Sequence, residues 1–177
     1  MPSIDRTATP ATGLRRKMIL LCATGAGVGY APLIPGTVAT FVAIPFSICL
    51  NRLAEVSVLA ASVTLVVAII CAIGLAGKAA EILQKKDPGM IVIDEIVGFL
   101  LANFAAPTSA STLLMSFFLF RFFDITKVFP ASRLERLPGG TGIVADDLMA
   151  GIPSQPCGFW ARGEWYDRER RHSQHGR

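Results

Sequence analysis

Histidine is almost missing from this sequence. The 177-residue chain has two histidines, His172 and His175, and both lie in its polar C-terminal tail. A histidine nucleophile or a histidine acid–base pair within the apolar part of the chain is therefore excluded. The four cysteines form no C-x-x-C pair, and none is followed six residues later by arginine, so a cysteine-phosphatase loop is excluded. A P-loop and a D-x-D-x-T motif are also absent. Any hydrolysis must rest on carboxylates, a metal ion and basic residues.

Charged residues are also scarce, at 17% of the chain against roughly 25% in soluble domains. Three stretches lack them altogether, at residues 18–50, 56–77 and 96–120. A helix needs about 20 apolar residues to cross a bilayer, and residues 56–77 meet that length by themselves. A soluble protein this short cannot easily bury three such stretches. The composition therefore predicts an all-α, multi-span helical integral membrane protein.

The N-terminal part of the membrane domain is predicted to be broken. After a polar cytoplasmic tail at 1–17, an apolar stretch is interrupted by Gly25, Gly27, Gly29, Pro32 and Pro35. We expect a broken or re-entrant segment there, with its backbone groups satisfied by protein or water. The membrane domain should cover 18–152, and a polar basic tail 153–177. Within the domain we expect helices at about 37–50, 56–77, 91–105 and 112–123, a polar connection at 78–89 and a turn at 106–111.

The positive charges predict an orientation. If the N-terminus is cytoplasmic and four spans alternate, every Lys and Arg except Arg52 falls on the cytoplasmic side, as the positive-inside rule requires. The unusual ionisable residues then collect on that face, near headgroup depth. The basic residues flank membrane segments and do not alternate with aromatic ones, so the net charge of +4 does not indicate nucleic-acid binding.

Two acidic pairs are candidates for a metal site. Asp94 and Glu95 lie within the otherwise apolar IVIDEIVGF, and Asp146 and Asp147 follow PGGTGIVA. Adjacent carboxylates repel each other unless a cation lies between them, and hard oxygen ligands suit Mg²⁺. The alternative is a solvated helix end, above all for the second pair. We predict these four carboxylates as magnesium ligands.

Basic residues and glycines near these pairs could bind phosphate. Arg121 and Asp124 are spaced i, i+3 and so share a helix face, as a phosphate-binding guanidinium beside a carboxylate or as a structural ion pair. Lys127 adds positive charge, either at the site or against anionic lipid headgroups. The glycines in TGAGVGYAPLIPGTVAT could expose N–H groups to an anion or serve helix packing. Those in PGGTG precede a helix that we expect to end at Asp146 and Asp147, and they could bind phosphate at its start or form a simple turn.

Three blocks of the sequence resemble the phosphatidylglycerophosphatase A family, and their order agrees with it. They are GVGYAPLIPGTVATFVAIP, DPGMIVIDEIVGF and FRFFDITKVFPASRLERLPGGTGIVADDLMAG, and they cover roughly residues 27–151. The resemblance implies a Mg²⁺-dependent lipid phosphatase that removes the terminal phosphate of phosphatidylglycerophosphate to give phosphatidylglycerol. It also implies a multi-pass protein of the bacterial inner membrane whose active face is cytoplasmic.

Carried over residue by residue, the resemblance implies a catalytic site that consists of Asp94, Glu95, Arg121, Asp124, Lys127, Asp146 and Asp147, with Gly36 and Thr37 of the P-G-T core at the substrate phosphate. Whether Asp124 is ligand, base or nucleophile stays open. The chain departs from the family at Val128, Glu135, Pro138 and Ala145, and after Gly151, where the family usually continues into a last membrane helix. Two other functions stay open: a small transporter that uses Asp94 and Glu95, and an inactive relic of the phosphatase. A CDP-alcohol phosphotransferase is disfavoured, because its D-G-x-x-A-R spacing is absent.

Overall fold

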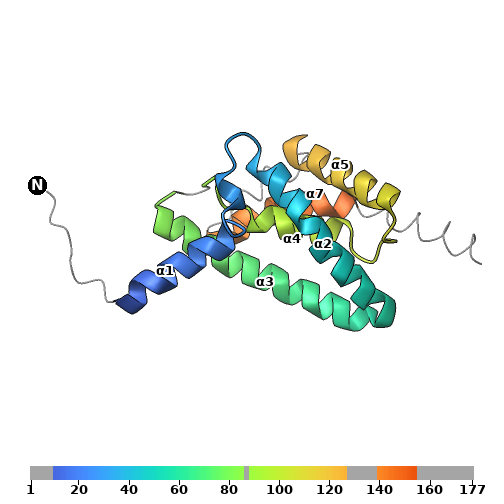
Figure 1. Ribbon diagram of the computed structural model, residues 1–177, viewed down its shortest axis with the longest axis horizontal. Helices are drawn as coiled ribbons and strands as arrows, with labels where there is room; N and C mark the ends of the chain where they lie inside the picture. Colours follow the sequence, from blue (N-terminus) through green and yellow to red (C-terminus); the bar gives the residue numbers. More distant parts are fainter. Residues whose placement is uncertain (1–9, 86–87, 127–138, 155–177) are drawn as a thin grey trace, which may run out of the picture.

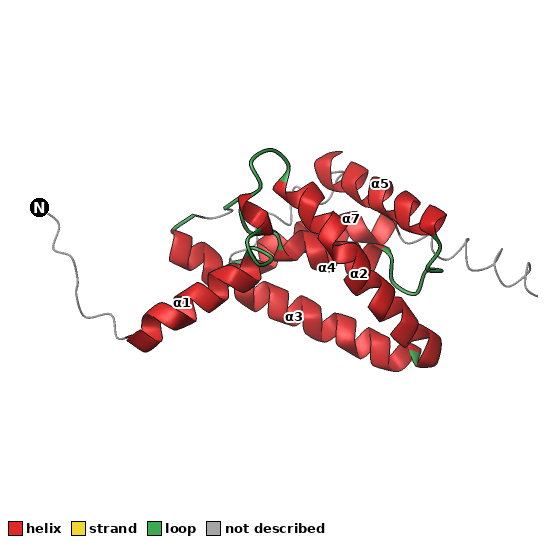
Figure 2. Cartoon of the chain, in the orientation of Figure 1, coloured by secondary structure: helices red, strands yellow, loops and turns green. Residues whose placement is uncertain are grey.

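The computed structural model describes residues 10–85, 88–126 and 139–154. Within these ranges every regular element is helical and no strand is present (Figure 2). The elements are, in chain order, α1 (Pro10–Ala23), the 3₁₀ turn η1 (Val28–Tyr30), α2 (Pro35–Val56), α3 (Val58–Leu83), α4 (Ile93–Ala102), α5 (Ala110–Thr126) and α7 (Gly140–Ser154). The prediction of an all-α protein is confirmed for these residues.

Helical structure is interrupted between α1 and α2, as the glycines in this segment predicted. Gly25 and Gly27 have φ angles of 56° and 99°, a left-handed conformation that glycine adopts without steric cost. Gly29 lies against the loop that precedes α4, where a β-carbon would come within 1.9 Å of the Met90 carbonyl oxygen. α1 nevertheless begins inside the segment predicted as a polar tail, so residues 10–17 are helical.

α2 and α3 are the two long helices, with 22 and 26 residues, and only Ser57 separates them (Figure 1). At about 1.5 Å per residue, both exceed the ~30 Å hydrocarbon core of a bilayer. Among the described residues, these two helices are long and apolar enough to cross a membrane. Only 17% of the most apolar window of α3 is buried, and Val63, Val66 and Ile70 are exposed. A face of this kind favours an apolar surrounding.

α4 lies at the centre of the molecule and packs against α2, α3, α5 and α7. It has 10 residues and is therefore about 15 Å long. This is shorter than the helix predicted at 91–105, and α4 is too short to cross a bilayer alone. It starts two residues later than predicted, after Val92, whose N–H donates to the carbonyl oxygen of Ala23 at 3.0 Å. It ends three residues earlier than predicted, before Ala105, which has a positive φ of 56°.

Small residues let α7 approach α3 and α4 closely. A β-carbon on Gly140 would lie 2.0 Å from the carbonyl oxygen of Ile73 in α3. One on Gly151 would lie 2.7 Å from the carbonyl oxygen of Gly98 in α4. Such contacts between small residues are typical of helices that pack within membranes. Gly140, one of the glycines before the second acidic pair, therefore serves close packing against α3.

α7 extends further than predicted. We expected a helix that ends at Asp146 and Asp147, but α7 continues to Ser154. Its later turns are held because Ala150 packs into a cluster with Phe99 and Phe120. The second acidic pair therefore lies in the middle of a packed helix rather than at a solvated helix end.

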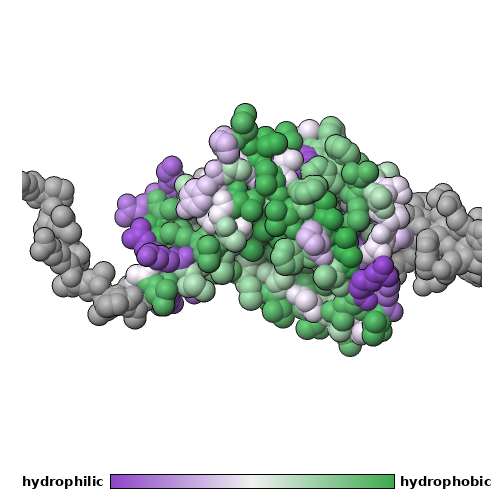
Figure 3. Space-filling model, viewed as in Figure 1, coloured by the Kyte–Doolittle hydropathy of each residue, from purple (hydrophilic) through white to green (hydrophobic). Residues whose placement is uncertain are grey.

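The surface is divided into apolar and hydrophilic zones. Figure 3 shows apolar residues across the middle of the visible face, over α2 and α5. Hydrophilic residues gather near α1 and the end of α3, and at the α2–α3 turn, where Arg52 and Glu55 form an exposed ion pair of 3.2 Å. Phe41 of α2 and Phe118 of α5 are exposed in spite of their size. This distribution favours membrane association.

A buried polar network joins α2, α4 and α5. The Asn103 side chain donates to Ser47 Oγ at 2.7 Å and accepts from Ser116 Oγ at 3.0 Å. Asn51 Nδ2 donates to the Asn103 carbonyl oxygen at 2.9 Å. All four residues are at most 2% exposed. Because an unpaired polar group is costly away from water, these bonds fix the three helices relative to one another.

Replacing Asn103 by alanine should destabilise the protein. The Ser47 and Ser116 hydroxyls would lose their buried partner, at about 1–3 kcal/mol for each group left unsatisfied. We expect a lower melting temperature in detergent, measured by circular dichroism. Ser111→Ala is the matched control, because Ser111 is exposed and bonds only to exposed Ser109 in this part of the chain. Equal melting temperatures for the two variants would show that the network contributes nothing to stability.

Candidate active site

Three carboxylates from two helices form an acidic cluster. Asp94 and Glu95 lie in the first turn of α4, and Asp147 lies in the middle of α7. One ligand oxygen from each lies within 4.8 Å of the others. This arrangement fits a divalent cation, which carboxylate oxygens bind at roughly 2.0–2.6 Å.

The sequence brings the two helices together at a glycine. Gly98 follows Asp94 by four residues and therefore lies on the same face of α4. A β-carbon on Gly98 would come within 2.9 Å of the Asp147 β-carbon and of the Phe120 ring. The missing side chain is what lets α7 place Asp147 beside the α4 carboxylates. Asp94 and Glu95 lie in the first turn of α4, where the positive end of the helix dipole favours negative charge.

The acidic cluster is buried and incompletely hydrogen-bonded. Asp94 and Asp147 are 7% and 5% exposed. Asp94 Oδ1 and Glu95 Oε2 are buried and accept no hydrogen bond from the described part of the chain. Asp94 is repelled by Glu95 and Asp147, and Asp147 is repelled in turn by Glu95 and Asp124. Buried, mutually repelling charges are unfavourable without a counter-charge, so the cluster fits a bound cation.

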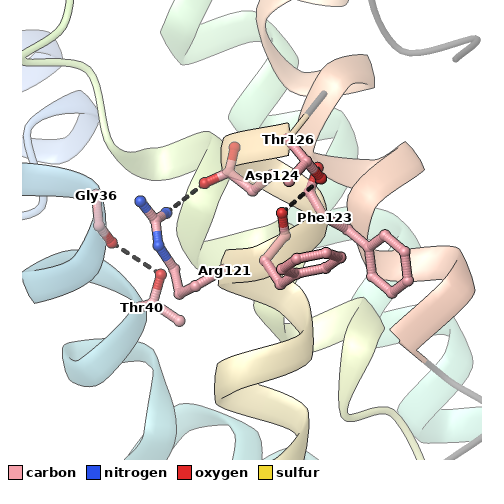
Figure 4. Close-up of polar contacts among 7 residues, drawn as sticks. Gly36, Thr40, Arg121, Phe123, Asp124 and Thr126 are labelled. Atoms are coloured by element: carbon pink, nitrogen blue, oxygen red, sulfur yellow. Dashed lines mark hydrogen bonds and ion pairs between the residues drawn. The ribbon is translucent and has the colours of Figure 1, made fainter. Parts of the chain in front are cut away.

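A basic group lies beside the acidic cluster. Arg121 and Asp124 form an ion pair near the end of α5, and their side chains are 15% and 16% exposed. Figure 4 shows the Arg121 guanidinium directed toward Gly36 and Thr40 of α2. Thr40 Oγ1 donates to the Gly36 carbonyl oxygen at 2.8 Å. The guanidinium thus lies between two helices, with its Nε and Nη1 atoms buried.

Gly36 is the point at which α2 meets both charged groups. A β-carbon there would lie 2.5 Å from Glu95 Oε1 and 3.0 Å from an Arg121 terminal nitrogen. The carboxylate of Glu95 and the guanidinium of Arg121 therefore approach the same point of the α2 backbone. An acidic cluster that could hold a metal ion, beside a guanidinium, suits the hydrolysis of a phosphate ester, because cation and guanidinium can both neutralise its oxygens.

Comparison with known proteins agrees with this chemistry. Residues 21–162 match the sequence profile of the family described as phosphatidylglycerophosphatase A. The chain belongs to this family.

Two proteins named phosphatidylglycerophosphatase A and one further relative are moderately similar to this chain. The phosphatidylglycerophosphatase A of Escherichia coli is 31% identical over 147 residues, which cover 82% of this chain and 84% of that protein. The protein of the same name from Haemophilus influenzae is 35% identical over 136 residues, 76% of this chain and 82% of its own length. A Bacteroides thetaiotaomicron protein is 32% identical over 139 residues, 76% of this chain and 87% of its own, and its name assigns it provisionally as a phosphatidylinositol-3-phosphatase. No solved structure matches the chain.

Family membership makes the chain a lipid phosphatase of a metal-dependent family, and its buried acidic triad could bind the metal. The family also implies a lipid phosphate as substrate and a membrane enzyme. These statements agree with the two membrane-length helices of the fold.

The structure brings together most residues predicted for the site. Asp94, Glu95 and Asp147 meet, and the Arg121–Asp124 pair lies beside them. Asp146 lies outside the group of converging oxygens, so a metal role for it stays a prediction. Thr37 follows Gly36 in the first turn of α2 and is half-buried. Lys127 lies outside the described residues.

Gly98 was not predicted as a site residue, and Gly36 was predicted in a different role. The i, i+4 spacing from Asp94 to Gly98 was visible in the sequence and marks a bare patch on the face that carries a carboxylate. Gly36 was predicted at the phosphate through the P-G-T core. The structure adds that its missing β-carbon makes room for Glu95 and Arg121.

Proposed function

We propose that this protein hydrolyses the terminal phosphomonoester of phosphatidylglycerophosphate and releases phosphatidylglycerol and inorganic phosphate. The observation that carries the proposal is the buried triad of Asp94, Glu95 and Asp147 beside Arg121. Two relatives that carry the name phosphatidylglycerophosphatase A support this substrate.

The acidic residues would hold Mg²⁺. Asp94, Glu95 and Asp147 supply the converging oxygens, and Asp146 is a candidate for a further ligand. When bound, the ion would polarise the phosphoryl group and favour ionisation of an attacking water. A water oxygen then bonds to phosphorus, the bond from phosphorus to the glycerol oxygen breaks, and that oxygen takes up a proton.

The basic residues would bind the phosphate itself. Arg121 can present two N–H groups to phosphate oxygens while Asp124 holds the guanidinium in place. Lys127 would add positive charge, and Gly36 with Thr37 would let the phosphate approach the start of α2. Asp124 would act as ligand, base or nucleophile, and these three roles stay open.

The proposed location is the bacterial inner membrane, with the site on the cytoplasmic face. The distribution of Lys and Arg along the sequence supports this orientation. The start of α2, which carries Gly36, lies at the end opposite the turn that carries Arg52, the one basic residue predicted outside.

The experiment that tests the function measures phosphate release from phosphatidylglycerophosphate in detergent micelles, with and without EDTA. We expect activity with Mg²⁺ and a loss of at least about a hundredfold in EDTA, restored by added Mg²⁺. Phosphatidylinositol 3-phosphate is the comparison substrate, because the name of one relative refers to it. Preferential hydrolysis of that lipid would replace the proposed substrate, and activity that resists EDTA would contradict the metal role.

A further inference from the structure

α5 carries an exposed apolar face that adjoins Arg121. Leu114, Phe118 and Ile125 are 57%, 66% and 69% exposed. Phe118 precedes Arg121 by three residues and follows Leu114 by four, and this spacing places them along one side of the helix. The Arg121 guanidinium is directed toward α2 (Figure 4) and its side chain is 15% exposed. Arg121 therefore lies at the border between the buried site and the exposed apolar face.

Contacts between α2 and α5 show the direction in which the exposed face of α5 extends from the site. Gly36, at the start of α2, lies against Arg121, near the end of α5. Further from the site, Asn103 joins Ser47 of α2 to Ser116 of α5. The two helices therefore run in opposite directions, and the path from Arg121 toward Leu114 follows α2 into the layer that α2 is long enough to cross. Leu114 lies about 10 Å from Arg121 along the helix axis.

We infer that this face of α5 binds an acyl chain of the lipid whose phosphate Arg121 binds. The chain would extend along Phe118 to Leu114, and these two residues would make the site selective for long-chain lipid phosphates. The substrate would then enter sideways from the bilayer rather than from water. Ile125 lies beyond Arg121, toward the end of the helix, and takes no part. This inference rests on the proposed function.

The position beside Arg121 distinguishes this face from other apolar surface. A membrane lipid phosphate brings an anionic group and an apolar chain that are covalently joined, so its binding site needs a cation and an apolar track side by side. Ile70 of α3 is 63% exposed, nearly as much as Phe118, but α3 contributes no residue to the acidic cluster or to the Arg121 pair. Contact with bulk lipid accounts for Ile70, and it makes Ile70 a matched control.

The test compares two substrates that differ in chain length. Initial rates of phosphate release are measured for dioleoyl phosphatidylglycerophosphate in mixed micelles and for its water-soluble dihexanoyl counterpart. The double variant Leu114→Ser/Phe118→Ser should lower kcat/KM for the dioleoyl lipid about tenfold, because apolar contact with the chain is lost. Its kcat/KM for the dihexanoyl lipid should stay within about twofold of wild type. Phe118→Ala, a milder change, should show the same selectivity at about threefold, and Ile70→Ser should change neither rate.

Each other outcome contradicts the inference in a recognisable way. Equal losses on both substrates would assign Leu114 and Phe118 a purely structural role. Equal losses together with a smaller assembly on size-exclusion chromatography would assign the face to contacts between copies of the chain. If both α5 variants keep the wild-type preference for the long-chain lipid, the inference is overturned and the proposed function stands. If the wild-type protein releases phosphate from neither lipid, the proposed function is overturned as well.

Discussion

Asp147→Asn should abolish most phosphate release and at the same time stabilise the metal-free protein. The substitution removes one of three converging oxygens, so the rate with Mg²⁺ should fall by about a hundredfold or more. Without metal, Asp147 is a buried charge repelled by Glu95 and Asp124. Removing that charge relieves the repulsion, so the melting temperature in EDTA should rise.

Added Mg²⁺ separates this prediction from a general defect in folding. A ligand that binds only the folded state stabilises it, by about 2.7 kcal/mol at a hundred times its Kd. Wild type should therefore melt at a higher temperature in Mg²⁺ than in EDTA, and Asp147→Asn should show little of this difference. Glu55→Gln is the control, since Glu55 is an exposed carboxylate at the α2–α3 turn. Full turnover by Asp147→Asn, or a Mg²⁺ shift equal to that of wild type, would remove Asp147 from the metal site.

Gly36→Ala is expected to inactivate the enzyme although it adds one methyl group. The new β-carbon would lie 2.5 Å from Glu95 Oε1 and 3.0 Å from an Arg121 nitrogen, which is closer than van der Waals contact allows. The Glu95 carboxylate must move away from its position, and the Arg121 guanidinium must shift by a few tenths of an ångström. A displacement of about 1 Å in a catalytic site lowers rates on the order of a hundredfold, and we expect a loss of that size in phosphate release.

Gly74→Ala is the matched control for this substitution. Gly74 is also a helical glycine, but nothing lies within 4 Å of the position its β-carbon would take. Alanine there should leave the rate unchanged and raise stability by about 0.5–1 kcal/mol, because glycine is a poor helix former. A Gly36→Ala protein with wild-type kcat would mean that Glu95 and Arg121 do not need their present positions for catalysis.

The helices around the site show which helix bounds the local sequence pattern predicts and which depend on tertiary contacts. The helices α2 and α3 were predicted from their uncharged runs at 37–50 and 56–77. Both extend further than predicted, α2 to Val56 and α3 to Leu83, inside the segment predicted as a polar connection. α4 was predicted too long, because both of its ends adjoin bonds to distant parts of the chain. The Val92 N–H donates to Ala23, which is 69 residues earlier, and the Ala105 N–H donates to the Asn51 side chain of α2. α7 was predicted too short, because its last turns are stabilised by packing against α4 and α5 rather than by their own sequence.

Composition alone indicated the class of the protein and the kind of chemistry its site could carry. Few charges, long apolar runs and the absence of usable histidine and cysteine left carboxylates, a metal and arginine in an apolar chain, and these are properties of composition that folding cannot alter. Only the tertiary structure decided which carboxylates meet. Neighbouring residues on a helix point about 100° apart, so Asp147 can face Asp94 and Glu95 while Asp146 remains outside their group. That choice depends on how α7 is rotated against α4, which Gly98 and Gly151 set by allowing the two backbones into contact.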